Sequence, residues 1–159
     1  MESHCYISPK NSNKAQSCME IIEASEGLKD QINAFYKSVG YHSNWSSTER
    51  AYCTLINNKV VGSIKVENIH GVSILRGMYL AESIQQKGYG TKFIQFIEPI
   101  LNKTTSFCIP FSYLESFYAR IGFKNISMQQ LPLFLQKRFV TYENIGYRII
   151  AMQRDVYSI

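Results

Sequence analysis

The stretch that decides the fold reads Gln85-Gln86-Lys87-Gly88-Tyr89-Gly90-Thr91, and it lies between a β-rich run and an apolar helical stripe. Its two glycines, one residue apart, allow the backbone to approach a ligand closely. The helix that follows directs free N–H groups and the positive end of its dipole at whatever lies there. Because Lys87 adds a positive charge, the segment is suited to a pyrophosphate group.

Two common phosphate-binding motifs are excluded. The chain has no Gly-x-x-x-x-Gly-Lys-Ser/Thr loop, and it has no Gly-x-Gly-x-x-Gly fingerprint followed by an acidic residue about twenty positions on. A Gly-x-Gly after a strand is a weak signal by itself, since many tight turns have the same pattern. The rest of the chain must therefore decide between a plain turn and a cofactor loop.

Hydrophobic periodicity gives the elements around this stretch. Strands are expected over residues 19–24, 51–57, 59–67, 72–80, 106–109 and 147–154. Helices are expected over about 27–39, from 90 to about 101, over about 112–120 and over 131–144, with Pro132 in the first turn of the last. Asn57-Asn58 predicts a hairpin turn. The order predicts an α/β fold, an α+β sandwich in which helices flank a mixed, mostly antiparallel sheet.

The bulk properties limit the number of domains and the compartment. The 159 residues are 45% hydrophobic, which fits one domain over residues 18–159 after a polar leader, residues 1–17, that we expect to be poorly ordered. No apolar run approaches the roughly 20 residues needed to cross a bilayer, and the first 17 residues lack the apolar core of a secretory signal. We therefore expect a cytoplasmic protein with no membrane partner.

The cysteines, Cys5, Cys18, Cys53 and Cys108, form no Cys-x-x-Cys pair, and no histidine lies at a metal-ligand spacing from them. We expect no metal site and no disulfide. The net charge of +5 suits a nucleotide cofactor as well as a nucleic acid. Because the basic residues are spread out, with no recognition helix or aromatic RNA-binding motif, nucleic acid is not an expected partner.

The segment from Gln85 to Gly90 resembles the signature Gln/Arg-x-x-Gly-x-Gly/Ala of the GNAT superfamily of acyl-CoA-dependent N-acyltransferases, which lies between its fourth strand and the next helix. A second block, Phe117 to Phe123, resembles the family's Phe-Tyr-x-x-x-Gly-Phe element. Val60-Val61-Gly62 is similar to its usual third-strand opening. The blocks have the family's order and spacing over residues 51–123, and the resemblance implies a single-domain GNAT-like fold.

The resemblance implies acetyl-CoA as co-substrate. Gln85 is then placed to order the loop, and the pantetheine arm pairs with the strand edge around Met78 and Leu80. Gly77 is compatible with a bulge that aims one N–H at the thioester carbonyl. The loop residues implied to hold the pyrophosphate are Gln86, Lys87, Gly88, Tyr89, Gly90 and Thr91.

Tyr118 is the catalytic candidate that the resemblance implies, as a proton donor to the departing CoA thiolate. The alternative is a core aromatic on a helix. The general base is not identified, because the strand 72–80 has no carboxylate. Glu67, His70, Glu82 and a water chain are candidates, although a solvated surface role is favoured for each of the three residues.

The acceptor is expected to be a primary amine of a small molecule or peptide. Arg76 either binds an acidic group of the acceptor or forms a structural salt bridge. Tyr41 and Trp45 either line the acceptor pocket or belong to a surface loop with Trp45 folded onto the core. Phe134 and Tyr142 present the same choice between acceptor and core.

The expected function is therefore N-acetyl transfer by direct attack of the amine on acetyl-CoA. The alternative is a non-catalytic acyl-CoA-binding regulatory module. One departure from the family pattern is Phe111, which occupies a place where members often have a cofactor-contacting asparagine. A homodimer is compatible with the resemblance, since dimers are common in the family.

Overall fold

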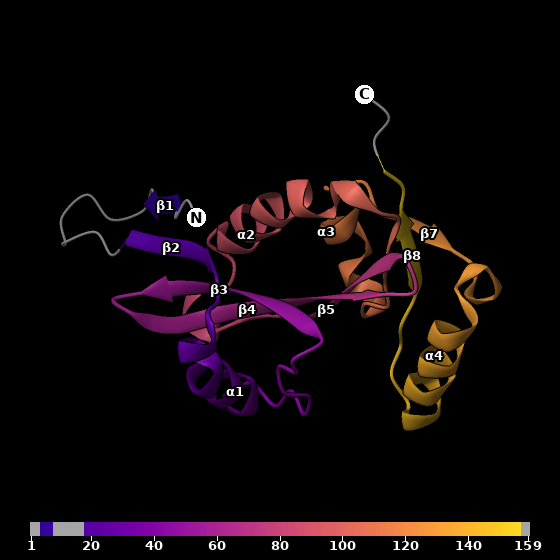
Figure 1. The fold of residues 1–159 in the computed structure, drawn as a ribbon, viewed down its shortest axis with the longest axis horizontal. Helices are drawn as coiled ribbons and strands as arrows, with labels where there is room; N and C mark the ends of the chain where they lie inside the picture. The colour runs from indigo at the N-terminus through magenta and orange to yellow at the C-terminus, as the bar shows by residue number, and fades with distance from the viewer. Residues whose placement is uncertain (1–3, 8–17, 157–159) are drawn as a thin grey trace. The chain divides into compact units, whose positions relative to one another are not determined.

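The computed structural model describes residues 4–7 and 18–156 (Figure 1). The chain divides into two compact units. The first contains residues up to Glu67 together with Arg76–Phe96, and the second contains Asn68–Leu75 and the residues from Ile97 onward. Strand β5 (Val72–Leu80) therefore supplies its first half to the second unit and its second half to the first.

The strands of the first unit follow one another in space in chain order, ending at β5: β1 (His4–Ile7), β2 (Cys18–Glu23), β3 (Glu49–Ile56) and β4 (Lys59–Ile69). The pairs β1–β2, β2–β3 and β3–β4 are antiparallel. The β3–β4 turn has left-handed φ angles of 51° at Asn57 and 61° at Asn58, as a two-residue hairpin turn requires. The predicted hairpin is confirmed.

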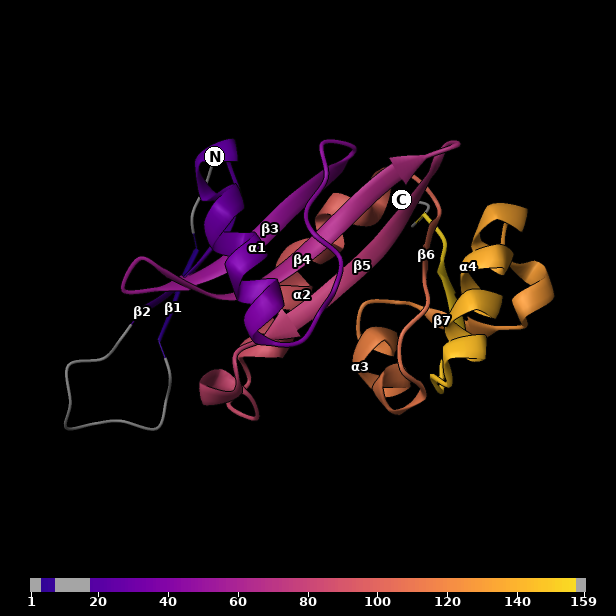
Figure 2. The same ribbon diagram turned by 90° about the horizontal axis from the view of Figure 1, so that it is seen from below.

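Helices cover both faces of these strands. A short 3-10 helix leads into α1 (Lys29–Ser38), and α2 (Tyr89–Ile97) follows the glycine-rich stretch. Figures 1 and 2 show α1 and α2 on opposite faces of β3 and β4. A strand covered on both faces buries every side chain, so polar residues of β4 are forced into the interior.

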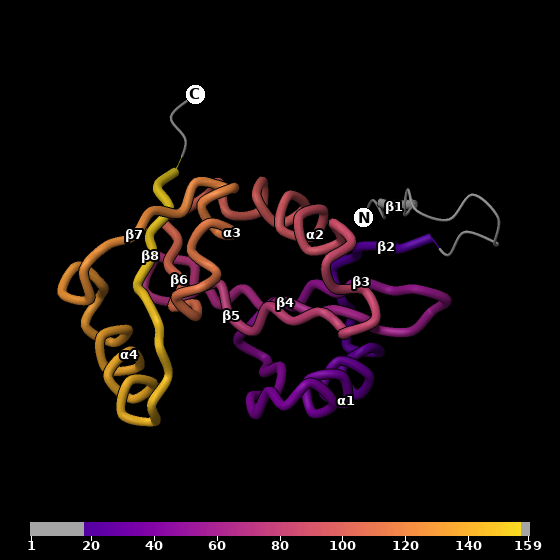
Figure 3. The backbone as a smooth tube through the Cα atoms, turned by 180° about the vertical axis from the view of Figure 1, so that it is seen from behind, coloured from indigo at the N-terminus to yellow at the C-terminus, as the bar shows by residue number. Residues whose placement is uncertain are grey.

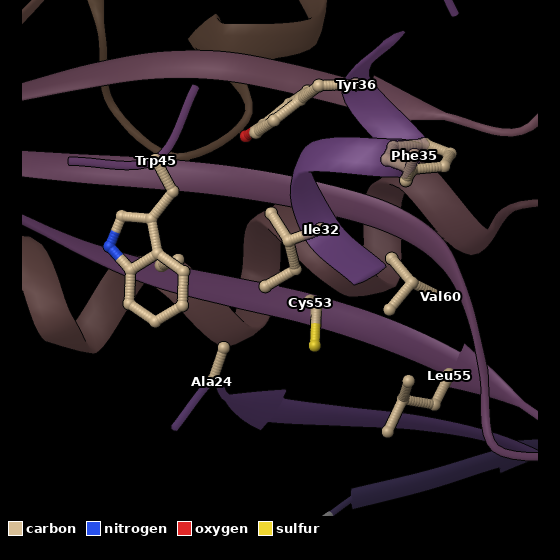
Figure 4. Packing of buried hydrophobic residues seen from close by; sticks show 9 residues of the cluster. Ala24, Ile32, Phe35, Tyr36, Trp45, Cys53, Leu55 and Val60 are labelled. Carbon is tan, nitrogen blue, oxygen red and sulfur yellow. The ribbon is translucent and has the colours of Figure 1, made fainter. Parts of the chain in front are cut away.

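The core of the first unit follows the two-residue alternation of β3. Ala51 and Cys53 point to the α1 face, where they pack with Ile32 and Tyr36 of the helix (Figure 4). Tyr52, between them, points to the α2 face and lies edge-on to Phe96 at a centroid distance of 6.4 Å. Full burial of one large apolar side chain, such as that of Ile32, stabilises the fold by about 1.5–3 kcal/mol.

The second unit continues from β5. β6 (Ser106–Cys108) is parallel to β5, β8 (Ala151–Arg154) is antiparallel to β6, and β7 (Lys124–Ile126) is antiparallel to β8. Figure 3 shows α4 (Leu133–Ile145) running beside β8. Its buried face packs against residues of β5, β6 and β8, and the main members are Leu135, Phe139, Ile74, Phe107 and Ala151.

A buried arginine joins separate parts of this second unit. Arg154, 1% exposed, donates to the carbonyl of Ile121 at 2.6 Å, to the carbonyl of Leu101 at 3.3 Å and to Asn102 Oδ1 at 2.7 Å. Its guanidinium also lies 3.8 Å from a Glu98 carboxylate oxygen. The planar guanidinium group of Arg154 therefore donates hydrogen bonds to several acceptors at once.

The predicted fold class, a mixed and mostly antiparallel sheet flanked by helices, is confirmed. Strand β7 was not predicted. The final strand begins at Ala151 and not at Tyr147, because the Tyr147 N–H instead bonds the carbonyl of Tyr142 where α4 ends. No helix in the described part of the chain is long and apolar enough to cross a membrane.

Within the predicted leader, His4–Ile7 forms strand β1, and the rest of residues 1–17 lies outside the described residues. The expectation of no disulfide is wrong for Cys18, which is disulfide-bonded. Cys53 and Cys108 are free and buried.

Candidate active site

The glycine-rich loop connects the end of β5 to the start of α2. The chain leaves β5 at Leu80, passes through a short 3-10 helix and exposes residues 85–88 before α2 begins at Tyr89. Gln86 and Gly88 have left-handed φ angles of 60° and 84°. A Cβ atom at Gly88 would meet nothing within 4 Å, so the backbone conformation, and not crowding, favours glycine there.

Two hydrogen bonds define the ends of this loop. Gln85 Nε2 donates to the carbonyl of Leu80 at 3.0 Å, which closes the loop onto the strand. The Lys92 N–H donates to the carbonyl of Gly88 at 3.2 Å, across the start of α2. The first-turn N–H groups of a helix have no acceptor within their own helix, so α2 directs such groups to the loop side. This geometry is suited to an anion.

The backbone of β5 is distorted at Gly77, which has a φ of 62°. The Tyr36 hydroxyl donates to the Gly77 carbonyl at 2.9 Å. A Cβ at this position would lie 3.0 Å from Tyr36 Oη, 3.0 Å from Tyr41 Cε1 and 3.2 Å from Lys65 Cε. Both the backbone angle and the packing therefore favour glycine. From Arg76 to Leu80 the strand is only half-buried.

Three tyrosine rings gather beside this distortion. The Tyr41 centroid lies 4.8 Å from that of Tyr36 and 5.0 Å from that of Tyr79. Tyr36 and Tyr79 meet edge-on at 6.3 Å. The rings of Tyr36 and Tyr41 also lie 5.4 Å and 5.1 Å from the Lys65 ammonium, within cation–π range.

A cluster of charged side chains lies on the same face, and we call Glu49, Lys65, Glu67 and Arg76 the charge cluster. Lys65 Nζ lies 3.5 Å from Glu49 Oε1, and Arg76 Nη1 lies 3.6 Å from Glu49 Oε2. The side chains of Lys65 and Glu49 are 0% and 3% exposed, and that of Arg76 is 23% exposed. Arg76 therefore forms an ion pair with Glu49, as one of the two interpretations of its sequence position expects.

Lys65 has further partners in the α1–β3 loop. Its ammonium donates to Ser43 Oγ at 3.3 Å and to the carbonyl of Asn44 at 3.2 Å. Burial lowers the pKa of Lys65, and the nearby Glu49 carboxylate opposes that shift. The loop that carries Tyr41 thus closes over the charge cluster.

The sequence-derived candidates for a general base occupy different environments. Glu67 lies directly opposite Glu49 in the β3–β4 register and is 7% exposed, so the expected surface role is wrong for this residue. It is buried because β4 is covered on both faces. Glu82 is exposed in the short 3-10 helix. His70, in the second unit, lies beside the Phe134 ring at 5.2 Å.

Trp45 packs in the core of the first unit. It is 7% exposed, and its indole N–H donates to the Glu49 carbonyl at 2.7 Å. Its backbone N–H donates to Asn33 Oδ1 at 2.9 Å. This position favours the alternative in which the ring folds back onto the core, and it gives Trp45 a second role in holding the Glu49 backbone.

Tyr118 belongs to the second unit, on α3 (Glu115–Ala119). It is 6% exposed, and its ring lies 5.1 Å from that of Phe117 and 6.1 Å from that of Phe123. Phe111, at the place of the absent asparagine, stacks on Tyr113 at 5.8 Å. The packing around Tyr118 is compatible with a core aromatic and with a proton donor held in a fixed orientation.

The family model described as the acetyltransferase (GNAT) family matches residues 16–123, which include the glycine-rich loop, the Gly77 distortion and Tyr118. The chain belongs to the acetyltransferase (GNAT) family. No curated protein sequence matches the chain.

Solved GNAT-like structures share the fold of this chain at low sequence identity. N-acetylglutamate synthase from Neisseria gonorrhoeae, complexed with coenzyme A and N-acetyl-glutamate, matches with a TM-score of 0.68 and 15% identity over 88% of this chain, but over only 35% of its own. The ribosomal-protein-S18-alanine N-acetyltransferase of Escherichia coli gives 0.65 and 11% over 89% and 96% of the two chains. The aminoglycoside 6'-N-acetyltransferase of Enterococcus faecium gives 0.62 and 16% over 87% and 98%.

The GNAT resemblance led to the loop and to Gly77 but did not lead to Glu49. In the sequence, Glu49 stands in the polar run Ser46 to Arg50, which is typical of a surface loop. A usable signal lay in β4, where Lys65 and Glu67 alternate with Ile64 and Val66. Charged residues at alternate positions of a central strand indicate a buried polar face that needs partners.

Proposed function

We propose that this GNAT-family chain transfers an acetyl group from acetyl-CoA to a primary amine of a small molecule or peptide by direct attack. The observation that carries the proposal is the exposed loop at the start of α2, with left-handed Gln86 and Gly88 and with Gln85 bonded to Leu80. These features fit a pyrophosphate better than a plain turn, since a plain turn needs no helix start behind it.

The residues of the loop would hold the cofactor through their backbone. The N–H groups of Gln86, Lys87, Gly88, Tyr89, Gly90 and Thr91 are the proposed pyrophosphate ligands. Along β5, the half-buried edge at Met78 and Leu80 is the proposed partner of the pantetheine arm. The coenzyme A complex of the related Neisseria synthase supports the cofactor class.

The chemistry needs a proton donor for the sulfur and a free amine for the attack. As nitrogen bonds to the thioester carbon, the carbon–sulfur bond breaks, the thiolate takes up a proton, and the nitrogen releases one to water, from which the proton donor is recharged. We assign the proton that the thiolate takes up to the Tyr118 hydroxyl. The distorted backbone at Gly77, fixed by Tyr36, is the proposed source of the N–H that stabilises the carbonyl oxygen.

The half-buried residues beside that distortion, Tyr41 and Arg76, are the proposed lining of the acceptor site. Relatives named for acting on alanine and on aminoglycosides support an amine. The second candidate, a non-catalytic acyl-CoA-binding module, is favoured by the burial of Tyr118 at 6% exposure, which suits a core aromatic as well as a catalyst.

The first test is heat stability with acetyl-CoA, coenzyme A or adenosine. A ligand at about one hundred times its dissociation constant should add about 2.7 kcal/mol, and adenosine should add little. Gly88→Glu should abolish the rise in Tm. Gly71→Glu is the matched control, because Gly71 has a similar φ of 78°, has no neighbour within 4 Å and lies outside the loop. If millimolar acetyl-CoA does not raise the Tm, the proposal that the loop binds this cofactor is wrong.

The second step separates the enzyme from the binding module. Release of the CoA thiol should be measured with a panel of primary amines, for the wild type and for Tyr118→Phe. If the chain is an enzyme, release of the CoA thiol should depend on the amine. Tyr118→Phe should then have a lower kcat and the same rise in Tm with acetyl-CoA as the wild type. Binding without release for any amine supports the module instead.

A further inference from the structure

The charge cluster contains one carboxylate oxygen whose bonding is incomplete. Glu49 Oε1 accepts hydrogen bonds from the Ser46 N–H at 3.2 Å and from Ser46 Oγ at 3.0 Å. Glu49 Oε2 is buried and has no hydrogen-bond partner among the described residues, although Arg76 Nη1 lies 3.6 Å away. Buried carboxylate oxygens are mostly hydrogen-bonded, so Glu49 Oε2 has the capacity to accept an N–H or O–H from a bound molecule.

We propose that Glu49 Oε2 accepts a hydrogen bond from the amino group of the acceptor and so makes Glu49 an acceptor-binding residue. The inference rests on the proposed acetyltransferase function and identifies the residue at which its acceptor is held. The favoured acceptor is a primary amine on an apolar or aromatic body.

The place of Glu49 in the first unit supports this assignment. Lys65 lies close to both Glu49 and Gly77. Its ammonium lies 3.5 Å from Glu49 Oε1, and its Cε lies 3.2 Å from the position that a Cβ would take at Gly77. Arg76, the partner of Oε2, is the residue immediately before Gly77. The carboxylate therefore lies beside the backbone to which the proposed function assigns the thioester.

The surroundings suit an amine in particular. The rings of Tyr36 and Tyr41 already face an ammonium, that of Lys65. The cluster has two carboxylates, Glu49 and Glu67, and two cations, Lys65 and Arg76, and its formal charge is zero. The Glu49 carboxylate and the two tyrosine rings attract the ammonium form of an amine, so these groups favour an amine over an uncharged acceptor.

A structural role for Glu49 is the competing explanation. The carboxylate also neutralises the buried Lys65, and a buried cation without its partner destabilises the fold. A variant that loses Glu49 alone therefore changes both stability and any acceptor site. Removing the charge of Lys65 in the same molecule restores the charge balance of the cluster without restoring the negatively charged hydrogen-bond acceptor.

The test compares three variants: Glu49→Gln, Glu49→Gln with Lys65→Met, and the control Glu23→Gln. Glu23 lies on β2 and forms a bidentate pair with Arg50, at 2.7 Å and 2.9 Å, so its variant loses an ion pair elsewhere in the same unit. The acceptors are benzylamine, ethanolamine, spermidine and L-lysine. The readouts are the KM for the best acceptor, the KM for acetyl-CoA, and the rise in Tm with acetyl-CoA.

We expect Glu49→Gln to raise the acceptor KM about ten-fold or more, as loss of a charge-assisted hydrogen bond does, and to leave the KM for acetyl-CoA unchanged. The double variant should keep the raised acceptor KM even where it regains stability, and it supplies the test if Glu49→Gln fails to fold. Glu23→Gln should change neither KM.

Two results would overturn the inference, and each is distinct from failure of the proposed function. The first is an acceptor KM in Glu49→Gln that stays at the wild-type value. The second is a wild-type acceptor KM in the double variant, which assigns Glu49 to charge balance alone. If acetyl-CoA binds but no amine in the panel is acetylated, the proposed transferase function fails and this inference fails with it.

Discussion

At the scale of single residues, Gly77 is the position where backbone and packing requirements coincide. Its φ of 62° lies in the left-handed region, and a Cβ there would crowd Tyr36, Tyr41 and Lys65 at 3.0–3.2 Å. We expect Gly77→Ala to lose about 1–2 kcal/mol from the backbone angle and a further 1–3 kcal/mol from overpacking. Urea unfolding followed by circular dichroism measures the total.

Gly71→Ala is the matched control for that variant. Gly71 has a φ of 78° but no atom within 4 Å of a built Cβ, so its alanine variant has the backbone term alone. Equal losses of stability in the two variants would show that Tyr36 and Tyr41 move aside for the methyl group, and the expected overpacking at Gly77 would be wrong.

What the sequence can predict about single residues depends on whether a local pattern encodes the role. The left-handed conformations at Gln86 and Gly88 lie in a stretch that the sequence already singled out, because glycine spacing is a local signal. Glu49 was missed because it stands in a polar run, whereas its burial depends on the Trp45 ring hydrogen-bonded to its backbone and on the pairing of β3 with β4. Its environment is produced only by the folded sheet.

At the scale of elements, Arg154 connects β8 to Leu101 and Asn102, in the 3-10 helix that follows α2, and to Ile121, which follows α3. Lysine has one nitrogen and cannot reach all these acceptors. We expect Arg154→Lys to lower the free energy of unfolding by about 2–4 kcal/mol, because buried carbonyl groups lose their donors. Thermal and urea unfolding both measure the change.

Arg148→Lys is the control for Arg154→Lys. Arg148 is exposed and lies in the same carboxy-terminal segment, so its variant should stay within about 0.5 kcal/mol of the wild type. A loss of stability as small in Arg154→Lys would mean that the buried hydrogen bonds of this side chain are replaced by others.

Elements with a strong pattern were predicted well, and short ones were not. The strand expected over residues 72–80 has the bounds observed for β5, and α1 lies within the expected helix. β7, Lys124–Ile126, has only one apolar residue and becomes a strand because β8 offers it hydrogen-bonding groups. Such a strand is produced by its neighbour and not by its own composition.

At the scale of the whole molecule, the net charge of +5 should assist the binding of a polyanionic cofactor. Raising the salt concentration from 0.1 M to 1 M shortens the screening length from about 10 Å to about 3 Å. We expect the Kd for acetyl-CoA to rise several-fold over this range, measured by titration calorimetry. The CoA fragment pantetheine, which lacks the phosphates, should show little change, and an equal change for both ligands would contradict the electrostatic explanation.

The division of β5 between the two units has a consequence for the order of events during translation. The first unit needs residues up to Glu67 and then Arg76–Phe96, so the ribosome must make part of the second unit before the first is complete. Glu49 and Lys65 can meet as soon as β3 and β4 pair, whereas Arg76 and the glycine-rich loop emerge later. Since chains fold from the amino terminus as they are made, the Glu49–Lys65 part of the acceptor side can assemble before Arg76 and the cofactor side.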